Sequence, residues 1–341
     1  MSQPRPFRFA VQSYAADSGD QWRNRARRVE ELGYSAFHLA DHFLGAGEAL
    51  EVANHPIQNV ASVPAIAVAA EATESLRVGC RVFCIDYREP VILAKEACTL
   101  DFFSGGRLEL GLGAGWLRSE YEAVGIPFDK PSVRIARLEE MIRFLRAFAG
   151  DGPIDFQGDH IRASGFEGAP KPVQKPLPPI MIGGGSRRIL ELAAREADIV
   201  SLNFNNRSGV LGPDGVSTGT EEKTLEKIGW IRDAAGDRMK DLELEVGAYF
   251  TAVTDNGRAT AEAFGGPMGL SADDVLASPH ALMGTPEEIV AALEADGGEW
   301  AQKQLSTLRT KSPQTIKVAL RQLVEGAAKP SFADNMAMEY G

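Results

Sequence analysis

Two neighbouring side chains in this sequence, Asp41 and His42, are of the kinds that move protons in enzymes. They lie near the end of the apolar segment Ser35–Phe43, which is predicted to be a β-strand. Imidazole has an ordinary pKa of about 6.5, so a histidine at a strand end can donate or accept a proton near neutral pH. The alternative is a histidine that only hydrogen-bonds the following loop. Position in the sequence does not decide between the two.

A glycine turn further along the chain could hold an anion. It follows the predicted strand Ile180–Ile182 and opens the predicted helix Arg187–Arg195. Exposed backbone N–H groups, the helix dipole and the guanidinium groups of Arg187 and Arg188 suit a phosphate. A plain glycine turn is the alternative, and the absence of a following Gly-Lys-Ser/Thr excludes a Walker loop. The candidate anion-binding residues are Gly183, Gly184, Gly185, Ser186 and Arg187.

The stretch Ser104–Tyr121 combines a strand pattern with an unusual number of glycines. Three leucines alternate with Glu109, Gly111 and Gly113, so one face of the predicted strand is apolar and the other is nearly bare. Glycine weakens a strand unless a ligand or another backbone must approach closely. Gly115 and Trp116 then follow. The stretch predicts either a strand that runs into a binding site or a strand in a crowded barrel interior.

The elements that must position these residues alternate between strands and helices seven times. This alternation predicts a parallel sheet with crossover helices. Because glycine-rich turns recur after several strands, we expect a closed TIM (β/α)8 barrel with insertions, whose site lies at the carboxyl ends of the strands. The predicted strands are Phe7–Tyr14, Ser35–Phe43, Leu76–Ile85, one beginning at Arg107, Ile180–Ile182, Asp198–Phe204 and Leu242–Val253. The helices between them are Asp20–Leu32, an alanine-rich helix within Pro56–Thr73, Glu89–Phe103, Val133–Phe148, Arg187–Arg195 and Glu221–Ala235.

Composition narrows the possible partners and compartment. The net charge of −11 argues against nucleic acid or an anionic membrane as the main partner. The N-terminal residues have no apolar signal core, and no apolar run reaches the length of about 18 residues that a membrane span needs. Three clustered cysteines without metal spacing indicate reduced thiols, and Cys80 and Cys84 are predicted to pack in the core. We therefore expect a cytoplasmic protein with no metal site.

Several motifs resemble the luciferase-like monooxygenase superfamily, and more narrowly its coenzyme F420-dependent oxidoreductases. The resemblance runs from about residue 7 to residue 292. It rests on LADH at Leu39–His42, SGGRLELGLGAGW at Ser104–Trp116, KPVQKPLPPIMIGGG at Lys171–Gly185, AAREADIV at Ala193–Val200 and LMGTPEEIV at Leu282–Val290.

The resemblance implies a TIM barrel, usually dimeric, that binds F420 or reduced FMN at the strand ends. It would place Asp41 and His42 beside the coenzyme ring, with His42 as proton donor or base. Arg81 and Val82 fall where such proteins have a bulge, sometimes with a non-proline cis peptide, behind the ring. The segment from Gly113 through Gly115 to Trp116 would border the ring and its ribityl chain. The glycine turn Gly183–Arg188 would hold the phosphate, in agreement with its predicted anion binding.

The C-terminal part of the sequence departs from that family. From Ala301 onward no segment has the pattern of a buried parallel strand, so the eighth strand is not evident. The residues from 293 to 341 instead resemble the C-terminal helices of crotonase-fold 3-hydroxyisobutyryl-CoA hydrolases. We expect a barrel domain over 1–292, with an insertion at 151–179, and an atypical helical tail over 293–341.

These observations support an oxidoreductase that transfers hydride between F420 and an unknown organic substrate. We expect the protein to form a homodimer and to bind a small-molecule substrate. An FMNH2-dependent monooxygenase would use the same motifs. A barrel compromised by its tail, able at most to bind flavin, is a third hypothesis. An aldolase-like barrel is disfavoured because no lysine lies at the end of a predicted strand.

Overall fold

The computed structural model describes residues 8–53, 55–285 and 287–288. Contacts between α-carbons divide the chain into two units. The first is Phe9–Gly247, and the second contains Ala248–Gly341 together with Met1–Arg8. The predicted division at residues 292 and 293 lies outside the described residues and stays a prediction.

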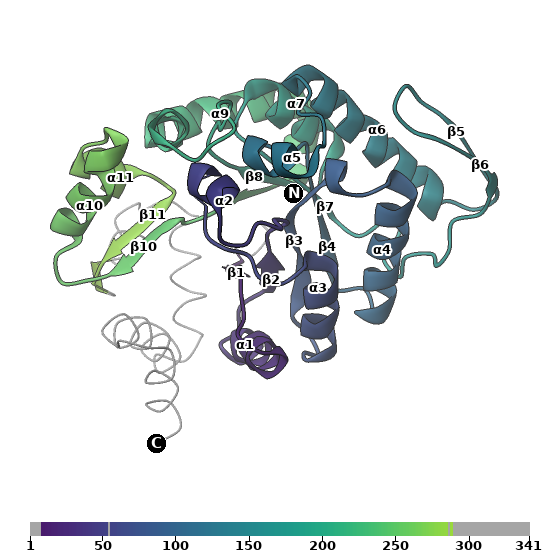
Figure 1. The fold of residues 1–341 in the computed structure, drawn as a ribbon, viewed down its shortest axis with the longest axis horizontal. Helices are drawn as coiled ribbons and strands as arrows, with labels where there is room; N and C mark the ends of the chain where they lie inside the picture. Colours follow the sequence, from purple (N-terminus) through teal and green to yellow (C-terminus); the bar gives the residue numbers. More distant parts are fainter. Residues whose placement is uncertain (1–7, 54, 286, 289–341) are drawn as a thin grey trace. The chain divides into compact units, whose positions relative to one another are not determined.

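A parallel seven-stranded sheet forms the first unit, in the order β1-β2-β3-β4-β7-β8-β9 (Figure 1). Every neighbouring pair in this sheet is parallel, as the alternation of strands and helices predicts. The strands are β1 Ala10–Ser13, β2 Ala36–Leu39, β3 Arg77–Cys84, β4 Leu108–Gly113, β7 Ile180–Gly184, β8 Ile199–Leu202 and β9 Glu243–Val246. The predicted parallel α/β architecture is confirmed.

Helices connect the strands and pack around the sheet (Figure 1). The α-helices are α1 Gly19–Glu31, α2 Glu48–Ala53, α3 Ser62–Glu71, α4 Pro90–Phe103, α5 Arg118–Val124, α6 Pro131–Ala149, α7 Arg187–Glu196, α8 Pro213–Val216 and α9 Glu221–Ala235. Short 3-10 helices are η1 Ile85–Tyr87, η2 Ser217–Gly219 and η3 Gly236–Asp241. None of the helices in the described part of the chain is long and apolar enough to cross a membrane.

The helix boundaries follow from capping and burial. The Ser18 side chain accepts a hydrogen bond from the Gln21 backbone N–H at the start of α1, and Thr220 caps α9 in the same way. In the connection between α4 and β4, Gly105 and Gly106 have φ values of 64° and 84°, which glycine adopts readily, and they turn the chain into β4.

The sheet is curled, and an ion pair between β3 and β9 shows it. Arg81 Nε lies 2.9 Å from both carboxylate oxygens of Glu245. These strands are four positions apart in the sheet, which would separate them by about 19 Å if it were flat. Two side chains cannot span that distance, so the two strands face each other across the concave side. The outer side of β4 presents Leu108, Leu110 and Leu112, all fully buried in the main apolar core.

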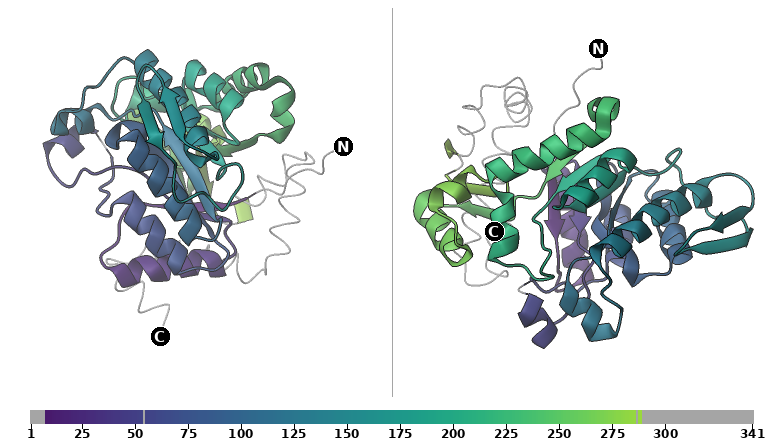
Figure 2. Two further views of the ribbon diagram at one scale, coloured as in Figure 1. Left: turned by 90° about the vertical axis from the view of Figure 1, so that its right-hand side faces the viewer. Right: turned by 90° about the horizontal axis from the view of Figure 1, so that it is seen from above.

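The segment predicted as an insertion at 151–179 contains a β-hairpin. Its strands are β5 Ile154–Gln157 and β6 Arg162–Phe166, which pair in antiparallel fashion. The hairpin projects from the side of the first unit (Figures 1 and 2). Phe156 packs edge-on against Phe144 of α6, with ring centroids 5.4 Å apart.

The alanine-rich helix predicted within Pro56–Thr73 is α3, which begins at Ser62 and ends at Glu71. Gln58 and Asn59, which precede α3, form hydrogen bonds with other loops instead of a further helical turn. The Gln58 side chain donates to the Ala40 carbonyl and accepts from the His42 backbone N–H. The Asn59 amide exchanges two hydrogen bonds with the backbone of Ala16. These contacts tie the loops after β1 and β2 together.

The single strand predicted over Leu242–Val253 is wrong. The chain leaves the extended sheet after Val246, and a separate strand, β10, follows at Phe250–Val253 in the second unit. There β10 pairs in parallel with β11 Ala281–Gly284, and α10 Gly257–Gly265, η4 Gly266–Met268 and α11 Ala272–Ala277 connect them. Residues 301–341, in which no eighth strand is evident, lie outside the described residues.

Candidate active site

A bulge in β3 lies at the centre of the candidate site. The Arg81–Val82 peptide bond is cis. The pairing of β3 with β4 shifts register between Cys80 and Phe83, on either side of that bond. The bulge and cis peptide that the sequence resemblance implies at this position are both present.

The glycines of the neighbouring strands make room for Val82. A methyl group on Gly113 would stand 2.5 Å from Val82 Cγ2, and one on Gly183 would stand 3.4 Å from Val82 Cγ1. A methyl group on Gly111 would run into the Cys80 carbonyl. A crowded interior therefore accounts for the bare face of β4, in agreement with one of the two interpretations of this stretch. The approach of a ligand to the same strand stays a prediction.

The segment that leaves β4 is held by an arginine from α6. Arg134 donates to the carbonyls of Ala114 and Gly115, and its guanidinium lies 4.1 Å from the centre of the Phe128 ring. Gly115 has a φ of 73°, and a side chain there would overlap the Tyr121 hydroxyl. These contacts fix the backbone that leads into Trp116.

His42 is part of a cluster of rings at the carboxyl edge of the sheet. Its ring centroid lies 4.1 Å from that of His55 and 5.9 Å from that of Trp116, which it meets edge-on. Tyr14, which follows β1, approaches His55 edge-on at 5.8 Å. Loops after β1, β2 and β4, and the segment between α2 and α3, therefore bring four rings together.

A carboxylate from α5 holds the His42 ring. His42 Nδ1 lies 2.8 Å from Glu120 Oε2, and the Phe43 backbone N–H donates to Glu120 Oε1 at 2.8 Å. Within the described part of the chain, His42 Nε2 makes no hydrogen bond. The imidazole is thus anchored through one nitrogen, and the other is available for proton transfer.

Asp41 has a different environment from its neighbour. Its carboxylate accepts hydrogen bonds from the Ser62 hydroxyl, the Cys84 backbone N–H and the Arg88 guanidinium. Four donor atoms therefore occupy a carboxylate that is buried. These are the contacts of a residue that joins the ends of β2 and β3. The predicted proton-transfer role is better matched by His42.

The glycine turn predicted at Gly183–Gly185 is shorter in the structure, because Gly183 and Gly184 end β7 and only Gly185 and Ser186 connect it to α7. Ser186 is the residue before α7, and its side chain makes no capping bond, so the first N–H groups of the helix have no partner from that side chain. Gly185 packs so closely on the backbone after β8 that any side chain would collide with it. Arg187 and Arg188 are exposed, and Arg187 pairs with Glu191 one turn later at 2.7 Å. The turn therefore has the donors that anion binding needs.

Comparison with known protein families identifies this architecture. Residues 5–210, more than half of the chain, match the model of the luciferase-like monooxygenase family. The chain belongs to that family. Six of the seven strands of the parallel sheet and the β3 bulge described above lie within the matched residues, and β9 lies beyond them.

Relatives in the luciferase-like family include proteins with two different coenzymes. The chain is 34% identical over 139 residues to an FMNH2-dependent dimethylsulfone monooxygenase of Pseudomonas putida, covering 41% of this chain and 38% of that protein. It is 27% identical over 258 residues to an F420-dependent glucose-6-phosphate dehydrogenase of Amycolatopsis mediterranei, covering 73% and 70%. The chain thus spans well under half of the length of the first of these relatives.

Solved structures agree on the fold. An F420-dependent secondary alcohol dehydrogenase, solved in complex with an F420–acetone adduct, superposes with a TM-score of 0.64 at 19% identity, covering 84% of this chain and 88% of that one.

The C-terminal part of the chain matches a second family model. Residues 272–341 match the enoyl-CoA hydratase/isomerase model. That match supports the crotonase-like resemblance of the tail and begins before residue 293, within the second unit.

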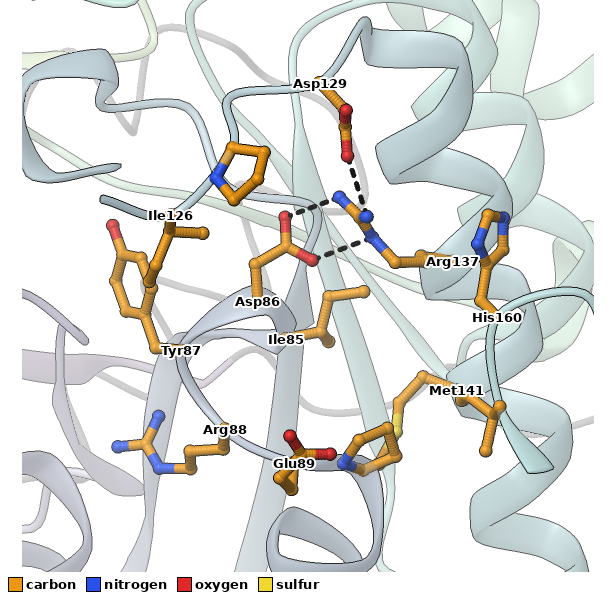
Figure 3. A pocket seen from close by; sticks show the side chains of 13 residues that line it. Ile85, Asp86, Tyr87, Arg88, Glu89, Ile126, Asp129, Arg137, Met141 and His160 are labelled. Carbon is orange, nitrogen blue, oxygen red and sulfur yellow. Dashed lines mark hydrogen bonds and ion pairs between the residues drawn. The ribbon is translucent and has the colours of Figure 1, made fainter. Parts of the chain in front are cut away.

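The luciferase-like unit also has a cavity beside the segment that follows β3. It has a volume of about 430 Å³ and lies between η1, the α5–α6 connection, α6 and the hairpin loop (Figure 3). Arg137 is held between Asp86, at 3.0 Å, and Asp129, at 2.8 Å. The charges facing this space largely neutralise one another. None of the predicted site residues lines it.

The structure brings most, but not all, of the predicted residues together. His42 and Trp116 meet in the ring cluster, while Val82, Gly113 and Gly183 meet at the bulge. The side chain of Arg81 instead turns to Glu245 on the concave face. Cys80 and Cys84 are buried, as predicted, and burial raises the pKa of Cys84 to about 12.

Sequence reasoning missed three residues of this site: Glu120, Arg134 and His55. Glu120 follows the glycine-rich strand by only seven residues and is fully buried, yet a single glutamate in a polar stretch carries no signal of burial. In the sequence, nothing distinguishes Arg134 from the other arginines of the same amphipathic helix. His55 lies between two helices without a surrounding motif.

Proposed function

We propose that the protein is an oxidoreductase that transfers hydride between coenzyme F420 and a small organic substrate, with His42 moving the accompanying proton. The observation that carries this proposal is the pairing of His42 Nδ1 with the buried Glu120 at 2.8 Å. It leaves Nε2 as the proton-transfer atom at the carboxyl edge of the sheet, where family members bind their coenzyme. F420-dependent relatives support the choice of coenzyme.

The residues present fit a flat ring with a phosphate-bearing chain. Gly113 and Gly183 have no side chains, and between them Val82 offers an apolar surface that is partly exposed. The N-terminus of α7, with Arg188 exposed beside it, suits a phosphate. Val82, Gly113 and Gly183 would therefore support the ring, and the turn Gly183–Arg188 would hold the phosphate.

The protein's own contribution to the reaction is orientation and proton transfer. The coenzyme, when bound, supplies or receives the hydride. For reduction of a carbonyl, hydride adds to carbon while the proton on His42 Nε2 goes to oxygen, which gives the alcohol. In the reverse direction the same nitrogen takes the proton from the hydroxyl group. Trp116 and His55 would shield this step from water.

An FMNH2-dependent monooxygenase is the second candidate. The similarity to the dimethylsulfone monooxygenase favours it. The same bulge, glycine turn and imidazole would serve a flavin. The two candidates differ in oxygen use, since the deazaflavin of F420 reacts poorly with oxygen.

Fluorescence titration of the purified full chain with F420, and separately with FMN, tests the choice. Tight binding of F420 with weak binding of FMN, and no oxygen consumption, would support hydride transfer. The reverse preference with oxygen consumption would support the monooxygenase. Binding of neither would favour the compromised barrel.

A homodimer and a small-molecule substrate belong to the same proposal. Light scattering should give a mass twice that of the 36.7 kDa chain. A mass of a single chain at micromolar concentration would contradict the dimer and leave the choice of coenzyme untouched.

A further inference from the structure

Glu120 is the most deeply buried acidic group at the candidate site, with no exposed surface. Burying an ionised carboxylate is very unfavourable unless several donors compensate. Three donors do so here. His42 Nδ1 lies at 2.8 Å and the Tyr87 hydroxyl at 2.6 Å from Oε2, while the Phe43 N–H lies at 2.8 Å from Oε1.

The donors keep Glu120 ionised and decide where the shared hydrogen lies. Burial alone would raise the pKa of Glu120, but the hydrogen bonds from His42, Tyr87 and Phe43 outweigh it and lower that pKa below its usual value. Burial raises the pKa of Tyr87 far above its ordinary value, so its hydroxyl keeps its proton and donates. The hydrogen between the imidazole and the carboxylate therefore belongs to His42 Nδ1.

We propose that Glu120 is the positioning residue of this enzyme: it holds His42 in the Nδ1–H tautomer. In general, a buried carboxylate on one nitrogen of an imidazole fixes the tautomer of the ring. The expected effect of Glu120 on catalysis rests on the proposed function, whereas the assignment of the His42 tautomer does not.

The other groups around His42 agree with this assignment. The His55 ring is tilted against that of His42, and burial, together with the proximity of His42, lowers the pKa of His55 to about 4. His55 is therefore neutral at neutral pH and does not compete for the proton. Asp41 is paired with Arg88, so Glu120 is the carboxylate that acts on the His42 ring directly.

Nitrogen-15 NMR of the imidazole rings in the unliganded full-length protein tests the tautomer without any activity measurement. The sequence has five histidines, and His42→Ala identifies the signals of His42 by their loss. We expect the pattern of an Nδ1–H ring at pH 7.5 and above. An Nε2–H pattern in the wild-type protein would overturn the proposal.

Glu120→Gln gives the sharper comparison. The Phe43 N–H requires an oxygen at the position of Oε1, so the amide NH2 group would face His42 Nδ1 and donate to it. We expect His42 to change to the Nε2–H tautomer in this variant. Tyr87→Phe is the matched control, because it removes one donor but keeps the charge of Glu120, and its tautomer should be that of the wild type. If Glu120→Gln keeps the Nδ1–H pattern, the proposal fails, and if the variant does not fold, the wild-type and Tyr87→Phe spectra decide.

Kinetics then tests the consequence for the reaction. With whichever coenzyme supports turnover, Glu120→Gln should lower kcat by about 10²- to 10⁴-fold and leave KM within about twofold. An unchanged kcat would overturn the positioning role. A wild-type protein that turns over with neither coenzyme would overturn the proposed function, and the NMR result would still decide the role of Glu120.

Discussion

Arg88 donates hydrogen bonds to both carboxylate oxygens of Asp41, at 2.6 Å and 2.9 Å. The pair joins the end of β2 to the connection after β3, and the Asp41 side chain is 6% exposed. Removal of one partner leaves the other charge buried without its counter-ion. The residue next to His42 thus serves to hold the loop that carries the imidazole.

Arg88→Ala should therefore destabilise the protein by about 3 kcal/mol, because it leaves the buried Asp41 carboxylate without its cation. Urea unfolding followed by circular dichroism measures the change. Arg23→Ala is the control, since its ion pair with Asp20 is exposed and should contribute about 0.5 kcal/mol or less. Equal effects of the two substitutions would contradict the structural importance of the Arg88 pair.

Gly113→Ala should destabilise the protein by about 1–3 kcal/mol, because the new methyl group would stand 2.5 Å from Val82 Cγ2. It should also weaken coenzyme binding, which fluorescence titration measures. Gly229→Ala in α9 is the matched control. Its methyl group would meet no atom within 4 Å, so helix propensity should give a gain of up to about 1 kcal/mol. A Gly113→Ala protein as stable as the wild type would show that the bulge is not crowded.

Arg134→Lys should loosen the segment that leads into Trp116, because an ammonium group cannot reproduce the bonds of the guanidinium to Asp129, Ala114 and Gly115. We expect a loss of about 2–4 kcal/mol in unfolding free energy, as for a buried charged donor. Arg143→Lys on the same helix is exposed and should change nothing measurable. Faster hydrogen exchange confined to residues 113–118 of the Arg134 variant would support this role of Arg134. Exchange that becomes faster to the same extent throughout the protein would contradict it.

The depressed pKa of His55 predicts a dependence of stability on pH. Its folded-state value is about 4, below the ordinary 6.5, so the unfolded chain binds a proton there that the folded protein does not. The contribution of the neutral His55 ring to the free energy of unfolding should be fully present above about pH 6.5. It should decrease by up to about 3 kcal/mol as the pH drops toward 4. His55→Gln should flatten that part of the curve, whereas His160→Gln, at an exposed residue, should leave its slope unchanged. If the unfolding free energies of the wild type and of His55→Gln change in parallel between pH 6.5 and 4, the prediction is wrong.

Local patterns predicted the elements well where residue type alternates regularly. The leucines of β4 and the cap of α9 specify their elements by themselves. The strand predicted over Leu242–Val253 failed because Gly247 and the following residues interrupt it without a change in hydrophobicity. The glycine turn and His42 could be found because residue type and strand end coincide. Glu120 and His55 could not, since their roles depend on contacts with residues far away in the sequence.

The ion pair between Arg81 and Glu245 has a consequence for the order of folding. It joins residues that are 164 positions apart, across strands that meet only when the sheet has curled. Closing so long a loop has a large entropic cost, and such contacts form late. The concave face should therefore be assembled after the outer layer of helices has packed. Loss of this pair should then speed unfolding while leaving the rate of folding almost unchanged.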